Sequence, residues 1–223
     1  NLELSPDGNL LAFSLEVFPA CGADLDCTKE RLDENEARQA SGKIYDSLFI
    51  RHWDTWADGR RNHLFVMPTA GGAAVDLMPG FDADAPSKPF GGSEEFTFTP
   101  DGKGVVFSAR NVGREEAWST NFDLFYSPLD GKTAPRQLTT NPAWDTQPMF
   151  SPDGKQISYT TNPTTKADDG NLSDIYIANT DGTGLPRKLH ENAGPDSGAR
   201  WSPDGKWISF SSRDAKNGLL GFQ

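Results

Sequence analysis

The sequence predicts an all-β fold, an incomplete β-propeller of four-stranded antiparallel blades. One observation behind this is a turn tetrapeptide, Ser-Pro-Asp-Gly or Thr-Pro-Asp-Gly, that occurs four times. A second is its spacing, because the last three copies start at residues 99, 151 and 202 and are therefore 52 and 51 residues apart. A third is that the apolar residues around each copy keep the same register. A fixed period near fifty residues indicates an array of repeated structural units.

Each copy of the tetrapeptide predicts a tight turn between two antiparallel strands. Proline presets the backbone for the second position of the turn, aspartate bonds the nearby backbone, and glycine takes the left-handed conformation that closes it. An apolar residue precedes every turn, namely Leu4, Phe98, Phe150 or Trp201. After the turns, apolar residues alternate at period two, which indicates strands with one buried face; the pairs are Leu11 and Phe13, Val105 and Phe107, Ile157 and Tyr159, and Ile208 and Phe210.

A second hairpin follows the first in each complete repeat. Its first strand is an apolar block, and its second strand is short and ends on leucine. The blocks are 64–67, 124–127 and 175–178, the turns contain Gly71, Gly131 and Gly182, and the short strands end on Leu77, Leu138 and Leu189. Four short antiparallel strands make one propeller blade. A β-sandwich is the alternative, but its strands do not repeat one side-chain pattern at a fixed period.

The repeats divide the chain into three blades and the start of a fourth. We expect blade 1 at 1–79 with an insertion at 18–62, blade 2 at 93–139, blade 3 at 147–190, and the start of blade 4 at 199–223. The insertion holds the single helical signal, from Thr28 to Ala40, with Thr28 as the N-cap and Gly42 as the stop. Propellers close with four to eight blades, so we expect this chain to be a fragment of a larger protein.

Charge and composition exclude several kinds of partner and cofactor. Lysine and arginine total 21 against 32 aspartates and glutamates, for a formal net charge of −11. Nucleic acids and anionic membrane surfaces both need basic patches, so neither is expected as a partner. We expect no cofactor, because no glycine-rich phosphate loop occurs. We also expect no metal, because His52, His63 and His190 lack ligand spacing to the cysteines.

The two cysteines, Cys21 and Cys27, lie close together in the insertion of blade 1. A disulfide between them would close a small loop and stabilise the fold by about 2 kcal/mol. It would also place the protein in an oxidising compartment, so we expect a periplasmic or secreted protein. Two reduced thiols are the alternative, and we favour the disulfide.

The lengths of the loops predict which face of the propeller carries the binding surface. The turns within the two hairpins of each blade are short and share one face, which we call the short-turn face. The longer connections at 18–62, 79–93, 111–121, 140–146, 162–173 and 191–197 share the other, the long-loop face. Binding residues concentrate on long loops held by a rigid scaffold, so we expect the binding surface there.

Two long-loop segments carry candidate binding residues. The first contributes His52, Trp53, Asp54 and Trp56, a cluster suited to stacking on a ligand or anchoring a partner domain; alternatively, it packs the insertion onto blade 1. The second contributes Glu115, Glu116, Trp118 and Asn121, where paired acids beside an indole suit a cationic amine; alternatively, it is a solvated acidic loop. Glu94 and Glu95 give a weaker form of the same signal. No Gly-x-Ser-x-Gly elbow occurs, so no catalytic residue is assigned.

These segments also carry a resemblance to a known family. Residues 47–59, Ser-Leu-Phe-Ile-Arg-His-Trp-Asp-Thr-Trp-Ala-Asp-Gly, run into His63-Leu64-Phe65-Val66. Together with Ala117-Trp118-Ser119-Thr120-Asn121, they resemble the N-terminal propeller of bacterial serine exopeptidases of the prolyl oligopeptidase family. The likeness is to the dipeptidyl peptidase V and acylaminoacyl peptidase branch, and it covers essentially the whole chain. The Ser-Pro-Asp-Gly-Lys turn is shared more widely, including with TolB-like propellers.

The resemblance implies a function and two partners. In that family a seven- or eight-bladed propeller caps a C-terminal α/β-hydrolase domain with a Ser-Asp-His triad, and it limits substrate size. Acidic residues of the dipeptidyl branch bind the peptide's free ammonium group. By this resemblance the chain is the substrate-filtering propeller of a serine exopeptidase, with a peptide substrate and a hydrolase domain as partners. Glu115 and Glu116 would anchor the amine, although the Tyr-Glu-Glu anchor of dipeptidyl peptidase IV relatives is not matched. Trp53, Trp56 and Trp118 would shape the cavity mouth.

A second function remains open on the sequence alone. A non-catalytic TolB-like propeller that binds a periplasmic protein partner would show the same repeats. A hydrolase segment in the parent gene would favour the peptidase, and its absence would favour the binding module.

Overall fold

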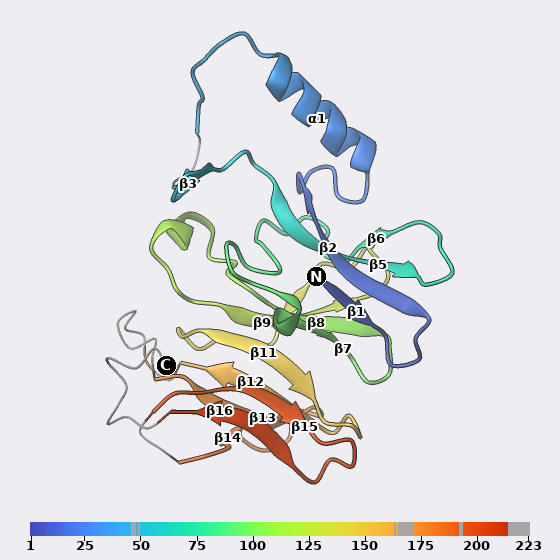
Figure 1. Ribbon diagram of the computed structural model, residues 1–223, viewed down its shortest axis with the longest axis vertical. Coiled ribbons are helices and arrows are strands. Elements are labelled where there is room, and N and C mark those ends of the chain that lie inside the picture. The colour runs from blue at the N-terminus through green and yellow to red at the C-terminus, as the bar shows by residue number, and fades with distance from the viewer. Residues whose placement is uncertain (46–47, 49, 163, 165–171, 192–193, 214–223) are drawn as a thin grey trace.

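Among the described residues, four antiparallel sheets follow one another along the molecule (Figure 1), and a two-stranded sheet in the insertion of blade 1 is the fifth. The computed structural model describes residues 1–45, 48, 50–162, 164, 172–191 and 194–213. Residues 214–223 of the expected fourth blade and most of the expected loop at 162–173 lie outside the described residues. The predicted fold is confirmed: three four-stranded antiparallel sheets and the first hairpin of a fourth, with one α-helix inserted in the first blade.

The strands of each sheet follow the chain order. Blade 1 contains β1 (Leu2–Leu4), β2 (Leu10–Val17), β5 (Arg61–Pro68) and β6 (Val75–Asp76). Blade 2 contains β7 (Phe96–Phe98), β8 (Gly104–Ala109), β9 (Asp123–Pro128) and β10 (Arg136–Gln137). Blade 3 contains β11 (Asp145–Phe150), β12 (Gln156–Thr161), β13 (Asp174–Asn179) and β14 (Arg187–Lys188). Blade 4 begins with β15 (Asp196–Trp201) and β16 (Ile208–Ser212).

The repeated turn is held by the same hydrogen bonds in every copy. In the first copy the Ser5 hydroxyl donates to Asp7 Oδ1 over 2.6 Å, and the Asn9 backbone N–H donates to the same oxygen over 3.1 Å. Gly8 has φ of +73°, in the left-handed region that glycine tolerates. In every copy, the hydrogen bond from the first residue's hydroxyl has the largest effect in lowering the pKa of the turn aspartate, and the hydrogen bond from a backbone N–H follows. The four aspartates are Asp7, Asp101, Asp153 and Asp204.

Backbone hydrogen bonds join the two hairpins of a blade on the short-turn face. The N–H of Thr69 donates to the carbonyl of Asn9 over 2.9 Å in blade 1, and that of Thr180 donates to Lys155 over 3.0 Å in blade 3. The connections between β2 and β5, between β8 and β9, and between blades therefore lie at the opposite ends of the strands, on the long-loop face.

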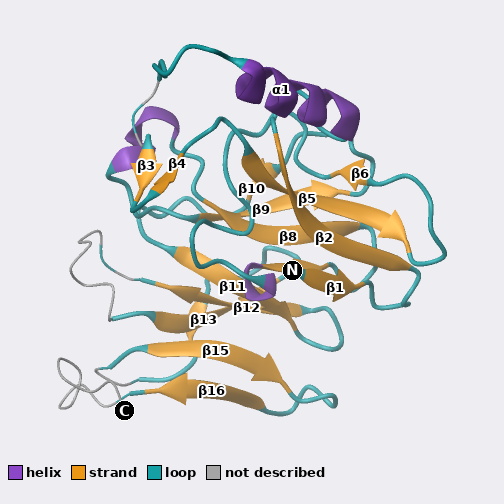
Figure 2. Cartoon of the chain, turned by 45° about the horizontal axis from the view of Figure 1, so that its top comes forward, coloured by secondary structure: helices purple, strands orange, loops and turns teal. Residues whose placement is uncertain are grey.

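The inserted helix starts and ends earlier than the sequence indicates. Helix α1 spans Leu25–Ala37 and stands away from the sheets (Figure 2). Its N-cap is Asp24, whose carboxylate accepts a hydrogen bond from the Cys27 N–H over 2.9 Å, so the prediction of Thr28 as N-cap is wrong. Aspartate is as effective an N-cap as threonine, and Asp24 comes first along the chain. Thr28 is instead buried in the first turn, and Arg38 is already extended well before Gly42.

The main hydrophobic core lies between blades 1 and 2. Phe107 is fully buried and stacks on Phe125 with 5.8 Å between ring centroids, and Phe81 meets Phe125 edge to face at 5.0 Å. Leu64 and Phe96 belong to the same cluster. A smaller cluster around Val106, Leu124 and Tyr159 joins blade 2 to blade 3. These cores fix the angle between blades and hence the positions of the loops on the long-loop face.

Among the described residues, no helix is long and apolar enough to cross a membrane. Within the same residues, no group of three or more histidine, cysteine, aspartate or glutamate side chains is arranged to hold a metal ion.

Candidate functional site

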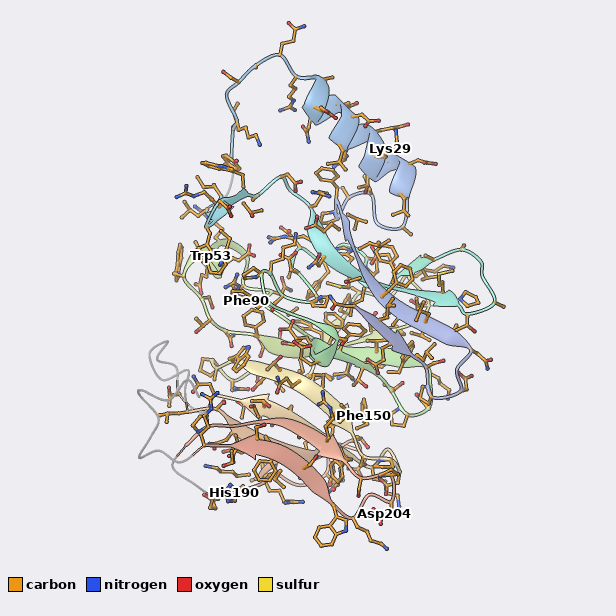
Figure 3. All side chains as sticks on the ribbon, in the orientation of Figure 1. Lys29, Trp53, Phe90, Phe150, His190 and Asp204 are labelled. Atoms are coloured by element: carbon orange, nitrogen blue, oxygen red, sulfur yellow. A yellow bond between two sulfur atoms is a disulfide. The ribbon has the colours of Figure 1, made fainter. Side chains whose placement is uncertain are left out.

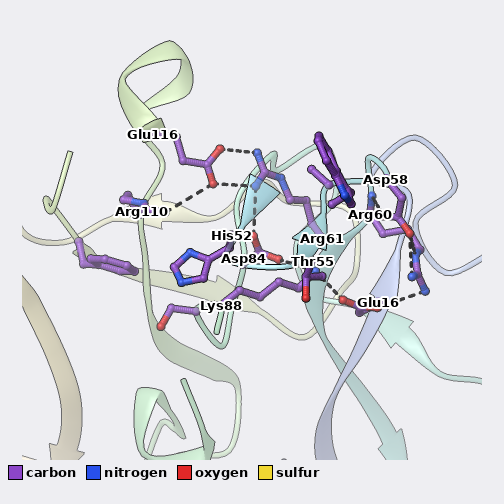
Figure 4. Close-up of a pocket in the computed structure, with 14 residues that line it drawn as sticks. Glu16, His52, Thr55, Asp58, Arg60, Arg61, Asp84, Lys88, Arg110 and Glu116 are labelled. Atoms are coloured by element: carbon purple, nitrogen blue, oxygen red, sulfur yellow. Dashed lines mark hydrogen bonds and ion pairs between the residues drawn. The ribbon is translucent and has the colours of Figure 1, made fainter. Parts of the chain in front are cut away.

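A charged cavity of about 190 Å³ opens on the long-loop face between blades 1 and 2 (Figure 4). The insertion of blade 1 contributes a small hairpin, β3 (Arg51–His52) and β4 (Thr55–Trp56), to one wall. The end of β2, the segment from β4 into the start of β5, the connection that leads to blade 2, and the loop after β8 supply the rest. We call this space the first cavity.

Arg61 occupies the centre of the charge network in this cavity. Its Nη1 and Nη2 donate to the two carboxylate oxygens of Glu116 over 2.7 and 2.8 Å. Its Nε donates to Asp82 over 2.8 Å, and Nη1 also reaches Asp84 over 3.1 Å. Burial by itself would lower the pKa of Arg61, but the hydrogen bonds with Glu116 and Asp82 raise it above its usual range. The guanidinium therefore stays charged and ties the loop of blade 2 to blade 1.

The other acids of the first cavity are also paired with bases. Arg60 contacts Glu16 over 3.1 Å and Asp58 over 2.7 Å. Lys88 contacts both Glu16 and Asp84. The charged lining residues are balanced in sign: the cations Arg60, Arg61, Lys88 and Arg110 face the anions Glu16, Asp58, Asp84 and Glu116. A neutralised lining gives a ligand of either charge little net attraction.

The predicted acidic segment is divided by this geometry. It forms a short 3-10 helix, η2 (Gly113–Ala117), in which Glu116 faces the first cavity and is held by Arg61. Glu115 is exposed, and Trp118 is 65% exposed. Asn121 turns its amide toward Asp123, with 3.4 Å between Nδ2 and Oδ2. The four residues therefore do not converge on one point.

The predicted aromatic segment forms the β3–β4 hairpin. Its turn residue Trp53 has φ of +50°, a conformation that costs energy in a residue with a side chain. Trp53 is 68% exposed and meets His52 and Phe90 edge to face, with ring centroids 4.8 and 5.4 Å apart (Figure 3). His52 and Trp56 line the first cavity, and Asp54 is exposed at the turn.

A second cavity of about 260 Å³ lies beside the first on the same face. Its described lining includes the acids Glu94 and Glu95 and no lysine, arginine or histidine; the other described lining residues are Ser87, Phe90, Gly91, Phe122, Trp144, Thr146 and Gln147. Burial raises the pKa of Glu95, hydrogen bonds from the Ser87 N–H and hydroxyl oppose this, and the charge of Glu94 raises it further. Phe122 lines both cavities.

Sequence reasoning identified only part of this second cavity. The adjacent acids Glu94 and Glu95 were recognisable, whereas Phe90, Trp144 and Gln147 were not. Phe90 comes from the connection into blade 2, Trp144 directly precedes β11, and Gln147 lies in β11, far along the chain from Phe90. Their convergence depends on how the blades pack.

Comparison with known proteins identifies the type of propeller. No family model matches the chain. The chain is 30% identical over 191 residues to dipeptidyl-peptidase 5 of Porphyromonas gingivalis, an alignment that covers 81% of this chain and 27% of that protein. It is 30% identical over 210 residues to dipeptidyl-peptidase 5 of Trichophyton equinum, covering 84% of this chain and 29% of that protein. The chain is a propeller of a peptidase family.

A solved structure supports the fold of this peptidase-family propeller. The putative TolB of Agrobacterium tumefaciens matches with a TM-score of 0.54 at 18% identity, covering 96% of this chain and 54% of that one. This likeness concerns the fold. The chain spans less than a third of the length of the two dipeptidyl-peptidase 5 relatives.

The peptidase-family propeller also has a disulfide between Cys21 and Cys27. It closes the turn that leads from β2 into α1, next to the N-cap of the helix. The bond lies in the insertion of blade 1, which also supplies the β3–β4 hairpin of the first cavity. It therefore restrains the beginning of the insertion that reaches the site.

Proposed function

We propose that this chain is the substrate-filtering propeller portion of a serine exopeptidase that removes dipeptides or blocked residues from short peptides. The observation that carries the proposal is the 30% identity to dipeptidyl-peptidase 5 proteins over more than four fifths of the chain. In this scheme the long-loop face meets an α/β-hydrolase domain of the same protein, and the peptide lies between them. The disulfide supports a periplasmic or secreted location, because such bonds persist in oxidising compartments.

The two cavities differ in how well they would hold the amino terminus of a peptide. An ammonium group needs a carboxylate whose charge is not already neutralised. Glu116 is bound in two places by Arg61, so it offers little net charge. Glu94 forms no ion pair within the described part of the chain, and its cavity lining contains no base. We therefore place the amino terminus in the second cavity, where Phe90 and Trp144 add cation–π surface.

Steady-state kinetics of the whole protein can distinguish an amino-terminus site at Glu94 from the site at Glu115 and Glu116 that the sequence indicates. Glu94→Gln should raise KM for dipeptide-releasing substrates about tenfold or more, since hydrogen bonds to charged groups contribute roughly 1.5–3 kcal/mol. Glu115→Gln and Glu116→Gln test the alternative anchor in the same assay. Glu36→Gln on the exposed face of α1 is the matched control. The effect of Glu94→Gln should vanish for substrates whose amino group is acylated, because these carry no ammonium.

Two other outcomes would contradict the placement of the amino terminus at Glu94. An unchanged KM for Glu94→Gln, with a raised KM for Glu115→Gln or Glu116→Gln, would move the anchor to η2. Unchanged kinetics in all three variants would remove the amine-binding role from this propeller.

A TolB-like binding module is the second candidate function, favoured by the structural match at a TM-score of 0.54. In that case the long-loop face would bind a periplasmic protein partner. A whole protein with an α/β-hydrolase domain and a Gly-x-Ser-x-Gly elbow would support the peptidase, and a whole protein without one would support the binding module.

A further inference from the structure

Equivalent positions of the three complete blades can be aligned by a shared backbone hydrogen bond. The N–H of Leu77 donates to the carbonyl of Leu64, that of Leu138 to Leu124, and that of Leu189 to Ile175, over 2.8, 2.7 and 2.8 Å. The residues just before these six therefore also correspond. The aligned pairs are His63 with Asp76, Asp123 with Gln137, and Asp174 with Lys188.

Two of these three aligned pairs combine an acid with a basic side chain. In blade 1, His63 Nδ1 lies 3.0 Å from Asp76 Oδ2. In blade 3, Lys188 Nζ lies 2.9 Å from Asp174 Oδ1. In blade 2, Asp123 receives only the neutral amide of Gln137, with 2.9 Å between Nε2 and Oδ2.

A second acid follows blade 2 and blade 3, where the same difference appears, whereas the equivalent position after blade 1 is Ala85. The N–H of Asp145 donates to Phe122 over 2.8 Å and that of Asp196 to Ser173 over 2.7 Å, so the two acids are equivalent. Asp196 has the ring of His190 nearby, with 3.3 Å between Nδ1 and Oδ2. The residue aligned with His190 is Thr139, which is neutral. The junction of blades 2 and 3 thus has both acids and neither base.

This acid pair is buried. Asp145 is fully buried, and Asp123 is 6% exposed. Among the described residues, neither carboxylate forms an ion pair, and Asp145 Oδ2 has no hydrogen-bond partner. Burial and then the charge of Asp145 raise the pKa of Asp123 to about 6, and burial raises the pKa of Asp145. A buried charge without a partner is costly, so uptake of a proton is favoured.

Among the described residues of the surrounding elements, none supplies a compensating charge. From β12, Tyr159 has a pKa raised to about 12 by burial and by Asp145, so it stays neutral. From β10, the guanidinium of Arg136 lies over the ring of Tyr126, 5.9 Å from its centroid. From β14, Lys188 pairs with Asp174 of its own blade. The other described contacts of the two carboxylates are neutral amides and hydroxyls: Asn121, Gln137, Thr139, Asn141 and Thr161.

We propose that Asp123, beside the buried Asp145, carries a bound proton in the folded protein at mildly acidic pH, and that its release weakens the junction between blades 2 and 3. The unfolded chain releases the proton from Asp123 near its ordinary pKa of 3.8, and the folded chain releases it near 6. The folded state therefore holds more protons between these values, and stability falls as pH rises through this window. Phe122 lines both cavities, accepts a hydrogen bond from the Asp145 N–H and precedes Asp123 in the chain. Release of the proton should therefore affect the linings of both cavities.

The test compares unfolding of the whole protein with that of Asp123→Asn at pH 4 and pH 7.5. The folding equilibrium constant of the variant, relative to wild type, should rise about a hundredfold between the two pH values, since one pKa unit is a factor of ten. The folding equilibrium constant of Gln137→Lys, relative to wild type, should also rise between pH 4 and pH 7.5, because this variant has the base that blade 3 has at this position. Carboxyl carbon NMR should show one aspartate titrating near pH 6 that disappears in Asp123→Asn.

Lys188→Gln is the matched reverse change, since it leaves Asp174 with the neutral partner that blade 2 has. It should lower stability at pH 7.5 more than at pH 4. The proposal would be overturned if the folding equilibrium constant of Asp123→Asn or Gln137→Lys, relative to wild type, did not vary with pH. The proposal would also be overturned if about 1 mM calcium at pH 7.5 stabilised the wild type but not Asp123→Asn, because the two acids would then hold a metal ion. These measurements do not depend on peptidase activity, so their failure is distinct from failure of the proposed function.

Discussion

Replacing Arg61 with methionine would remove the guanidinium that joins blade 1 to η2 while keeping most of the apolar stem. Arg61 contacts Asp82, Asp84 and Glu116, whose side chains are 78%, 12% and 14% exposed. The contact with Asp82 should contribute little, because exposed ion pairs are screened by water. The other two acids are buried enough that losing their partner leaves uncompensated charge.

The expected cost of this substitution is about 3 kcal/mol. Removing one partner of a fully buried ion pair costs roughly 3–5 kcal/mol. The lower end applies here because Arg61 itself is 20% exposed, Lys88 still lies 3.4 Å from Asp84, and Arg110 lies 3.8 Å from Glu116. For a domain of this size, the melting temperature should fall by about 6–12 °C.

Equilibrium unfolding in urea provides the measurement, with Lys29→Met as the matched control. Lys29 pairs with Asp33 on the exposed surface of α1, where the two side chains are 73% and 60% exposed. Its loss should cost less than about 0.5 kcal/mol. A cost for Arg61→Met as small as that of the control would refute the view that this network stabilises the site. Glu116→Gln should show a smaller loss than Arg61→Met, since it disrupts one contact of three.

Two further changes test the core and the insertion. Phe107→Ala should destabilise the protein by about 3–5 kcal/mol, because the ring is fully buried between Phe81 and Phe125; a loss below about 1 kcal/mol in urea unfolding would mean that this contact is not part of the core. Replacing Cys21 and Cys27 with serine together should cost about 2 kcal/mol through the entropy of the released loop. Hydrogen exchange of α1 amides should rise while exchange in β8 stays unchanged, and equal changes in both would argue against a local effect.

The long-loop face shows how far sequence patterns locate a site. The spacing of the turns correctly placed the long connections on one face. The hairpin with His52 and Trp56 reaches the first cavity, and its role in binding stays a prediction. The function assigned to Glu115 and Glu116 stays a prediction. No sequence pattern indicated that Glu116 would be bound in two places by Arg61, which lies 55 residues away along the chain.

Local rules determined the hairpins, the blades and the face that carries the long loops, because turn geometry and period-two burial depend only on residues close in sequence. The helix start was missed by a few residues because several residues near it are suitable caps. Tertiary structure alone decided which charges are neutralised. Glu116, which binds Arg61 in two places, comes from the next blade. Among the described residues, Asp123 and Asp145 lack the basic partners that the equivalent acids of blade 3 have, and only the spatial correspondence of the blades shows this. Electrostatic energy depends on distance and burial in space, which spacing along a chain does not specify.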